Sequence, residues 1–378
     1  MVKARQWLLN QKPENMPELD GDNATFKLVE KDLPDPKDDE VLVKLTYLSN
    51  DPAQRGWISK YINPERLYTA PVKEGTPMHA RGLAEVVESK SPSFKKGDTV
   101  IASTGWSEYA VLPAQQLQPA PDLPGGMGKT HYLGALGLTG LTAYFGLTEV
   151  VNTTKDDVVV VSGAAGATGM MAVQISKNIL GCKKVIGMAG SDEKCKWVES
   201  LGADLCLNYK KDSFKQDLEK ALPGPDGFAN VYFDNVGGEI TDFMLTRMAK
   251  FGRVSCCGAI SNYNNAAGTK PMGKTLPCLR HWLTLLPFCL QVTWASLFST
   301  VSTVAVLPLS WEHLANLRSK DMDKYGEASD IFKKALKDGK LKIDEGEHIV
   351  KGGFEDIPKT WMQLFSGANT GKLVTAVQ

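Results

Sequence analysis

The run Val158-Val-Val-Val-Ser-Gly163-Ala-Ala-Gly166-Ala-Thr-Gly169 decides the fold of this chain. Its four valines are typical of a strand that is buried on both faces, and residues 167–180 have the apolar spacing of a helix. Gly166 and Gly169 lack side chains, so the backbone between strand and helix can approach a pyrophosphate closely. The free N–H groups at the start of the helix would bind that anion. We therefore predict a dinucleotide-binding loop formed by Gly166, Ala167, Thr168 and Gly169.

Strand and helix patterns alternate on both sides of this loop, from about residue 134 onward. The strands are short and rich in Val and Ile, which predicts an α/β domain whose doubly wound parallel sheet is covered by helices on both faces. The expected helices are 136–150, 167–180, 192–201 and 325–338. The expected strands are 157–162, 184–188, 204–208 and 231–234.

The residues before 134 have a different pattern. The runs 41–48, 83–88 and 99–102 are short, β-type and bounded by Gly or Pro, and several of the 20 prolines fall in this part of the chain. We predict an antiparallel β domain with little helix here.

Composition excludes several classes of protein. The 378 residues carry 43 basic and 43 acidic side chains, and this balance argues against a nucleic-acid binder. None of the seven cysteines forms a C-x-x-C pair, which argues against a zinc ribbon or a disulfide framework and favours free thiols in a reducing compartment. The first ten residues resemble no secretory signal. We therefore expect a cytoplasmic protein.

The end of the second parallel strand indicates which dinucleotide binds. In NAD enzymes an acidic residue at this place binds the ribose 2′-hydroxyl. Here the strand ends in Ala189-Gly190-Ser191, and Lys194 follows in the next turn. Small residues leave room for a 2′-phosphate, Ser191 can donate a hydrogen bond, and Lys194 can balance the charge. We predict NADPH, with a solvated helix charge as the alternative interpretation of Lys194.

Several further runs follow the loop in a fixed order: Gly140-Leu-Thr-Ala-Tyr144, Gly190-Ser-Asp-Glu-Lys194, Asn208-Tyr-Lys210, Asp234-Asn-Val-Gly-Gly238, and Cys257-Gly-Ala-Ile-Ser261 with Tyr263. Together they resemble the zinc-independent branch of the medium-chain dehydrogenase/reductases. The most similar group is the NADPH-dependent double-bond reductases, which includes the prostaglandin reductases and the plant alkenal reductases. The resemblance covers about residues 40–265 and 325–378.

The resemblance implies a GroES-like antiparallel β domain over 1–133, a Rossmann NADP-binding domain over 134–338, and a return of 339–378 to the first domain. It also implies a homodimer. The adenosine phosphate pocket would be lined by Lys194 and Tyr209. The loop at Gly166 would hold the pyrophosphate, Asn235 would lie under the cofactor, and Asn369 would reach the cofactor from the C-terminal segment.

Zinc-dependent members of this superfamily need a Cys and a Gly-His-Glu near the catalytic cleft. No Cys precedes Cys182, and the second motif reads Met78-His79-Ala80-Arg81-Gly82. We therefore assign no metal and interpret His79 as a structural residue.

Without a metal, a conjugated carbonyl is the substrate that is easiest to reduce, because hydride can add at the β-carbon while charge moves to the enolate oxygen. A hydrogen-bond donor must then stand where the charge develops. Tyr263 is the candidate, as donor to that oxygen or as proton source for the α-carbon; the alternative is a loop tyrosine that shields the site. The cofactor ribose 2′-hydroxyl and water are the other candidates.

We expect the substrate pocket to be formed by Asp51, Ala53, Arg55 and Tyr263. Relatives often have Asp-Pro-Tyr-Met-Arg where this chain has Asp51-Pro-Ala-Gln-Arg55. Ala53 removes an aromatic wall, so the pocket should be wider or differently shaped. The sequence therefore predicts an NADPH-dependent reductase of α,β-unsaturated ketones and aldehydes. A quinone reductase and a non-catalytic NADPH-binding module are the alternatives.

One segment departs from the family pattern. Residues 271–321 are atypical, and no charged residue occurs between Trp282 and Trp311. Three interpretations remain: an insertion that forms a hydrophobic surface, a diverged form of the usual strands with Val304-Ala-Val-Leu307 as one strand, or an imperfect gene model. Pro287, Pro308 and many Ser and Thr residues argue against a transmembrane helix.

Overall fold

The computed structural model describes residues 2–64, 67, 69–224, 227–265, 292–293, 301–306 and 322–377. Contacts divide the chain into two compact units. The first unit contains Met1–Ile62, Ala70–Leu138 and Glu347–Gln378, and the second contains Asn63–Thr69 and Thr139–Gly346. The expected domain limits, at residues 133 and 338, stay a prediction.

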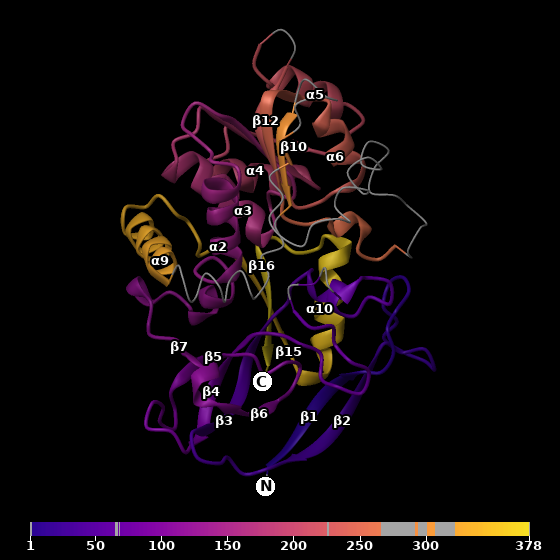
Figure 1. The fold of residues 1–378 in the computed structure, drawn as a ribbon, viewed down its shortest axis with the longest axis vertical. Coiled ribbons are helices and arrows are strands. Elements are labelled where there is room, and N and C mark those ends of the chain that lie inside the picture. Colours follow the sequence, from indigo (N-terminus) through magenta and orange to yellow (C-terminus); the bar gives the residue numbers. More distant parts are fainter. Residues whose placement is uncertain are drawn as a thin grey trace. The chain divides into compact units, whose positions relative to one another are not determined.

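The first unit is built on a mainly antiparallel sheet with the strand order β15-β16-β3-β4-β5-β7, in which β6 pairs with β3 and β15 runs parallel to β16. A separate ladder joins β1 to β2. Figure 1 shows that the C-terminal strands, in yellow, belong to the same unit as the indigo N-terminal ladder. The strands are β1 (Val2–Leu9), β2 (Phe26–Leu33), β3 (Glu40–Ser49), β4 (Gly82–Ser89), β5 (Thr99–Ala102), β6 (Tyr109–Pro113), β7 (Gln118–Pro119), β15 (Glu347–Gly352) and β16 (Lys372–Val377).

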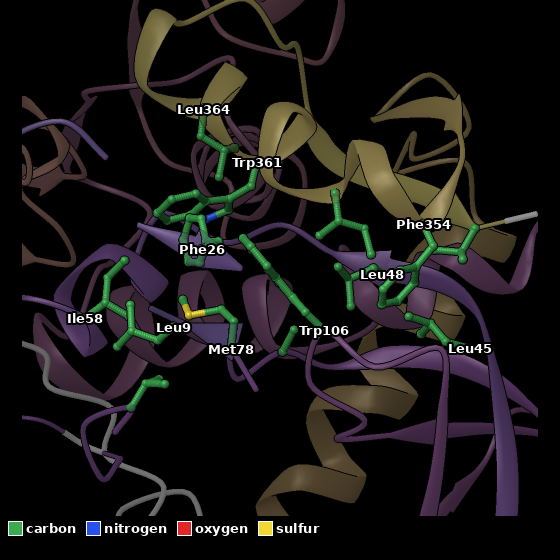
Figure 2. Packing of buried hydrophobic residues seen from close by; sticks show 14 of the residues in the cluster. Leu9, Phe26, Leu45, Leu48, Ile58, Met78, Trp106, Phe354, Trp361 and Leu364 are labelled. Carbon is green, nitrogen blue, oxygen red and sulfur yellow. The ribbon is translucent and has the colours of Figure 1, made fainter. Parts of the chain in front are cut away.

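The core of this unit is aromatic. Phe26 lies between Trp106 and Trp361, with ring centroids 4.7 and 5.9 Å away, and the two tryptophans meet edge to face at 5.8 Å (Figure 2). Trp361 comes from α10 (Ile357–Ser366), so the C-terminal helix completes a core that the N-terminal strands begin. Such offset and edge contacts add about 0.5–1.5 kcal/mol per pair beyond burial. The unit also contains the single-turn helix α1 (Gln54–Trp57) and short 3-10 helices at Ala114–Gln116, Pro124–Gly126, Lys129–Leu133 and Phe354–Asp356.

The second unit is built on a sheet with the strand order β10-β9-β8-β11-β12-β14-β13, parallel from β10 to β14, with β13 antiparallel at the edge. Its strands are β8 (Val158–Val161), β9 (Lys184–Ala189), β10 (Leu205–Asn208), β11 (Ala229–Asp234), β12 (Met248–Cys256), β13 (Val292–Thr293) and β14 (Val301–Val306). The six parallel strands, β10-β9-β8-β11-β12-β14, follow the Rossmann order 3-2-1-4-5-6. The predicted fold class, a GroES-like β domain with a Rossmann domain, is therefore confirmed.

Helices cover this second sheet (Figure 1). All four valines of β8 are buried, as a strand covered on both faces requires. The valines at 158 and 160 pack with residues of α5 and α6. The helices are α2 (Leu138–Phe145), which Gly146–Val150 extends with a wider turn, α3 (Ala167–Gln174), extended likewise by Ile175–Ile179, α4 (Asp192–Ser200), α5 (Phe214–Ala221), α6 (Gly238–Leu245) and α9 (Met322–Lys337).

The atypical segment 271–321 lies mostly outside the described residues. The backbone of β14 includes Val304 to Val306 and pairs in parallel with Val254 to Cys256 of β12. This is the place of the sixth Rossmann strand, which supports the interpretation that part of the segment is a diverged form of the usual strands. No helix in the described ranges combines the length and the apolar character that a bilayer crossing needs.

Candidate functional site

The predicted phosphate loop joins β8 to α3 with a backbone that leaves no room for a side chain at Gly169. Gly163 has a positive φ of 57°, and the N–H of Gly166 donates to its carbonyl oxygen at 2.9 Å. A Cβ on Gly169 would lie only 2.1 Å from that same oxygen. The N–H groups of Ala167 and Thr168 belong to the first turn of α3, where backbone donors have no partner within the helix. The loop can therefore present backbone donors to an anion.

A buried carboxylate organises the neighbouring strand end. Asp234, the last residue of β11, is 2% exposed. Its side chain accepts hydrogen bonds from five neutral donors, and no Lys or Arg of the described chain forms an ion pair with it. These donors are the hydroxyls of Ser162, Tyr232 and Thr241 and the backbone N–H groups of Val236 and Gly237. Several such bonds can satisfy a buried charge without a counter-ion.

This Asp234 cluster fixes Asn235. The backbone N–H of Asn235 donates to the Ser162 hydroxyl at 3.0 Å, and its Nδ2 donates to the Ser162 carbonyl at 2.7 Å. A Cβ on Gly163 would lie 3.4 Å from the Asn235 Cβ. Asn235 therefore lies beside the phosphate loop, between β8 and β11, where the strand order reverses and Rossmann sheets bind their ligands.

Tyr263 lies in the segment that follows β12, directly after the 3-10 helix Ile260–Asn262. Its hydroxyl oxygen accepts a hydrogen bond from the Ala259 N–H at 3.2 Å. A Cβ on Gly258 would lie 3.1 Å from this oxygen and 3.2 Å from the Asn235 carbonyl oxygen. Burial raises the pKa of Tyr263 above its ordinary value of 10.0. The group stays protonated at neutral pH, and the bond from Ala259 uses only an acceptor site of the oxygen, so the O–H can still donate.

The residues expected at the adenosine end lie together at the carboxyl ends of β9 and β10. The Ser191 hydroxyl caps α4 by accepting from the Lys194 N–H at 3.2 Å, and it can still donate its own hydrogen. A Cβ on Gly190 would lie 2.9 Å from the Tyr209 hydroxyl oxygen, so the tyrosine lies against bare backbone. Lys194 is half-buried, and burial, followed by the charge of Lys210, lowers its pKa.

The remaining predicted residues belong to the first unit. Asp51 follows β3 and forms an ion pair with the Nζ of Lys372, and Ala53 precedes α1. Arg55 is 1% exposed, and its Nη2 donates to the carbonyl oxygens of Pro13 and Asn15. The guanidinium thus holds the 13–15 loop. Asn369 donates from Nδ2 to the Gly371 carbonyl at 2.9 Å, and its expected contact with the cofactor stays a prediction.

The sequence predicted no role for Asp234 or for Lys372. An acidic residue that ends a strand of Val, Tyr and Phe was the available signal for Asp234. In the part of the chain that the structure describes, no three His, Cys, Asp or Glu side chains are grouped as a metal site would require.

The second unit fits a dinucleotide on its own geometry. The glycines of the phosphate loop and Gly190 leave two places where a Cβ would collide with backbone or with Tyr209. The pyrophosphate would lie at the first place, and an adenosine ribose phosphate at the second, beside Ser191 and Lys194.

Comparisons with known proteins agree with this geometry. Residues 5–120 match the family described as the N-terminal domain of oxidoreductase, and residues 167–289 match the family described as zinc-binding dehydrogenase. The chain is 33% identical to prostaglandin reductase 1 of Bos taurus over 382 residues, covering 99% of both chains. It is 31% identical to the NADPH-dependent curcumin reductase of Escherichia coli, covering 99% of this chain and 96% of that one.

A solved structure is similar over the same length. CurA from Vibrio vulnificus, crystallised in complex with NADPH, has a TM-score of 0.80 and 29% identity and covers 99% of both chains. Prostaglandin reductase 1 and the curcumin reductase, which match over nearly their whole length, belong to the group that the ordered motifs resemble. The chain thus belongs to the medium-chain dehydrogenase/reductases, in the zinc-independent group that contains the prostaglandin and curcumin reductases.

Proposed function

We propose that this protein reduces the carbon–carbon double bond of α,β-unsaturated ketones and aldehydes with NADPH. The family is one of NADP-dependent oxidoreductases. The substrate class is inferred from the position of the Tyr263 hydroxyl. This hydroxyl is held at the ends of β11 and β12 by the Ala259 N–H. A neutral donor fixed at this place suits the developing charge of an enolate.

In this proposal, different residues of the second unit bind different parts of the cofactor. Gly166, Ala167, Thr168 and Gly169 bind the pyrophosphate, Asn235 lies under the ribose or nicotinamide, and Ser191, Lys194 and Tyr209 take the 2′-phosphate. When bound, NADPH supplies the hydride that adds to the β-carbon. Tyr263 donates a hydrogen bond to the carbonyl oxygen, or a proton to the α-carbon. The expected roles of Asn369 at the cofactor and of Asp51, Ala53 and Arg55 in the substrate pocket stay predictions.

The first experiment follows NADPH oxidation by the purified protein, with matched unsaturated and saturated ketones and with NADH in parallel. Turnover of the unsaturated ketone alone, with NADPH preferred, supports the proposal. Turnover of quinones with one-electron products instead would favour a quinone reductase. Tight NADPH binding without oxidation by any acceptor would indicate a non-catalytic module.

Tyr263→Phe tests the mechanism. Loss of one positioned donor to a developing oxyanion should lower kcat by about 10²–10³-fold while NADPH affinity changes little. Tyr232→Phe, at a buried tyrosine that binds Asp234, is the matched control for loss of a tyrosine hydroxyl nearby. Equal loss of kcat in both variants would argue against a donor role for Tyr263.

We also propose a homodimer in the cytoplasm, as the family resemblance implies. Light scattering on the purified protein measures its mass directly, and a monomer at micromolar concentration would contradict the dimer.

A further inference from the structure

An acidic residue stands close to the place where the proposed cofactor needs positive charge. Asp192 is the first residue of α4 and directly follows Ser191. A carboxylate there stabilises the helix, because it complements the positive end of the helix dipole. The same carboxylate would repel a 2′-phosphate bound beside Ser191 and Lys194.

Two side chains contact this carboxylate, one at the end of β10 and one three residues after it. Lys211 Nζ lies 2.8 Å from Asp192 Oδ1, and Asn208 Nδ2 donates to the same oxygen at 3.0 Å. These contacts lower the pKa of Asp192 and raise that of Lys211. We call this arrangement of Asp192, Asn208 and Lys211 the clasp. It pairs the acid with a cation and directs it toward the β10 loop.

Two other lysines remain at the pocket. Lys194 is half-buried, and its pKa is lowered by burial first and by the charge of Lys210 second. Lys210 forms no ion pair with any residue in the described ranges. Lys210 directly follows Tyr209, whose N–H donates to the Ala189 carbonyl oxygen at 3.1 Å and whose hydroxyl lies against Gly190, so both lysines belong to backbone that borders this place. A doubly charged anion bound there would relieve the repulsion between the two cations.

We propose that the clasp is a coenzyme-specificity device: Lys211 and Asn208 cancel the charge of Asp192, so that Lys194 and Lys210 leave a net positive pocket for the 2′-phosphate. Lys210 is then a second phosphate cation beside Lys194. The proposal rests on the proposed function only in taking NADPH as the cofactor. An isolated exposed ion pair contributes little to stability, so the effect of the clasp is expected in binding.

The test measures binding of 2′,5′-ADP and of 5′-AMP by calorimetry, with NADPH and NADH in parallel. Lys211→Met exposes the acid and should weaken 2′,5′-ADP binding by about three- to tenfold. Asp192→Asn keeps the size of the side chain, removes the charge and should strengthen that binding by about two- to fivefold. The double variant should return close to the wild-type affinity.

Lys210→Met should weaken 2′,5′-ADP binding about as much as Lys211→Met. Lys220→Met, at an exposed lysine at the far end of α5, is the matched control and should change nothing. In every variant 5′-AMP and NADH should bind with less than about a twofold change, because neither carries the 2′-phosphate.

Changes of the same sign in Lys211→Met and Asp192→Asn would overturn the proposal, as would equal changes for 5′-AMP and 2′,5′-ADP. Raising the salt concentration should shrink all the differences together. Because 2′,5′-ADP carries no nicotinamide, these outcomes do not depend on whether the protein reduces enones.

Discussion

Each unit has a carboxylate at or just after the end of a strand, and the two are stabilised differently. Asp234 ends β11 and receives only hydrogen bonds from uncharged donors. Asp51 follows β3, and its main partner is Lys372, a lysine that is only 1% exposed. The Asp234 side chain is enclosed by its donors, whereas the side chain of Asp51 remains 30% exposed. One carboxylate thus fixes a loop through many weak contacts, and the other stabilises a buried cation.

This difference determines how much stability each site loses when one partner is removed. Around Asp234 every partner is neutral, so removing one leaves four others and no stranded charge. In the Asp51–Lys372 pair, removal of the carboxylate strands a buried ammonium group, which the Asn50 carbonyl at 3.1 Å only partly satisfies. Removal of the lysine instead leaves a carboxylate that water reaches and that the Ser49 hydroxyl still contacts. Loss of Asp51 should therefore destabilise the first unit more than loss of Lys372. Loss of one Asp234 donor should destabilise the second unit only slightly.

The largest expected effect is that of Asp51→Asn. An uncompensated buried cation costs about 3–5 kcal/mol, so the free energy of unfolding should fall by that amount. Urea denaturation of the purified variant measures it. Lys372→Met is the matched variant and should cost less, about 1–2 kcal/mol, because Asp51 keeps solvent contact. Equal costs that simply add in the double variant would show that the two residues are not coupled.

Asp234→Asn should have an intermediate effect on stability, about 1–3 kcal/mol. The amide keeps the shape and one acceptor oxygen, and the Thr241 hydroxyl can turn to accept from the new NH2 group. We expect the larger consequence in binding, because Asn235 and Ser162 lose a charged anchor: NADPH affinity should fall while the fold persists. Thr241→Val, which removes one donor only, is the control.

An unchanged NADPH affinity in Asp234→Asn, together with lowered stability, would mean that the Asp234 cluster supports the fold and does not position Asn235. Fluorescence titration of NADPH and thermal unfolding of the same preparation separate the two outcomes.

Local patterns predicted most of the fold. The strand at 99–102 matches β5 residue for residue, and the expected helix 192–201 differs from α4 by one residue at its end. Both depend on neighbours in the sequence: a short run of β-branched residues next to a turn in the strand, and a serine cap followed by acidic residues in the helix. The phosphate loop could be predicted equally well, because its conformation excludes a side chain at Gly169.

The pairings within the sites could not be predicted in this way. Asp51 and Lys372 are 321 positions apart, and Ser162 and Asp234 are 72 apart. No local periodicity links such residues, since only the sheet register brings them together. Asp192 and Lys211 are nearer in sequence, but a lysine in a polar loop is indistinguishable from a solvated one until its partner is seen. Segment 271–321 lacked a legible pattern for a different reason, since its apolar residues follow neither strand nor helix spacing.

The smallest effect on stability is expected for a third carboxylate, that of Glu108. Unlike Asp234 and Asp51, it is paired with an arginine that is partly exposed. Glu108 accepts two hydrogen bonds from Arg5, from Nε at 2.9 Å and from Nη2 at 3.0 Å. These hydrogen bonds lower the pKa of Glu108 below its ordinary value of 4.5. Because both side chains are partly exposed, the pair should contribute only about 0.5–1 kcal/mol at neutral pH.

The sign of its pH dependence follows from the lowered pKa. The unfolded chain binds the proton more tightly than the folded chain, so the contribution of the pair is complete above the ordinary glutamate pKa and is lost as the pH falls through the lower, folded value. Glu108→Gln should therefore be less stable than wild type at pH 7 and equal to it in sufficiently acidic buffer. Urea midpoints across this range measure the difference. A gap that persisted into acid would mean that the glutamine side chain itself, and not the loss of the Glu108 charge, destabilises the variant.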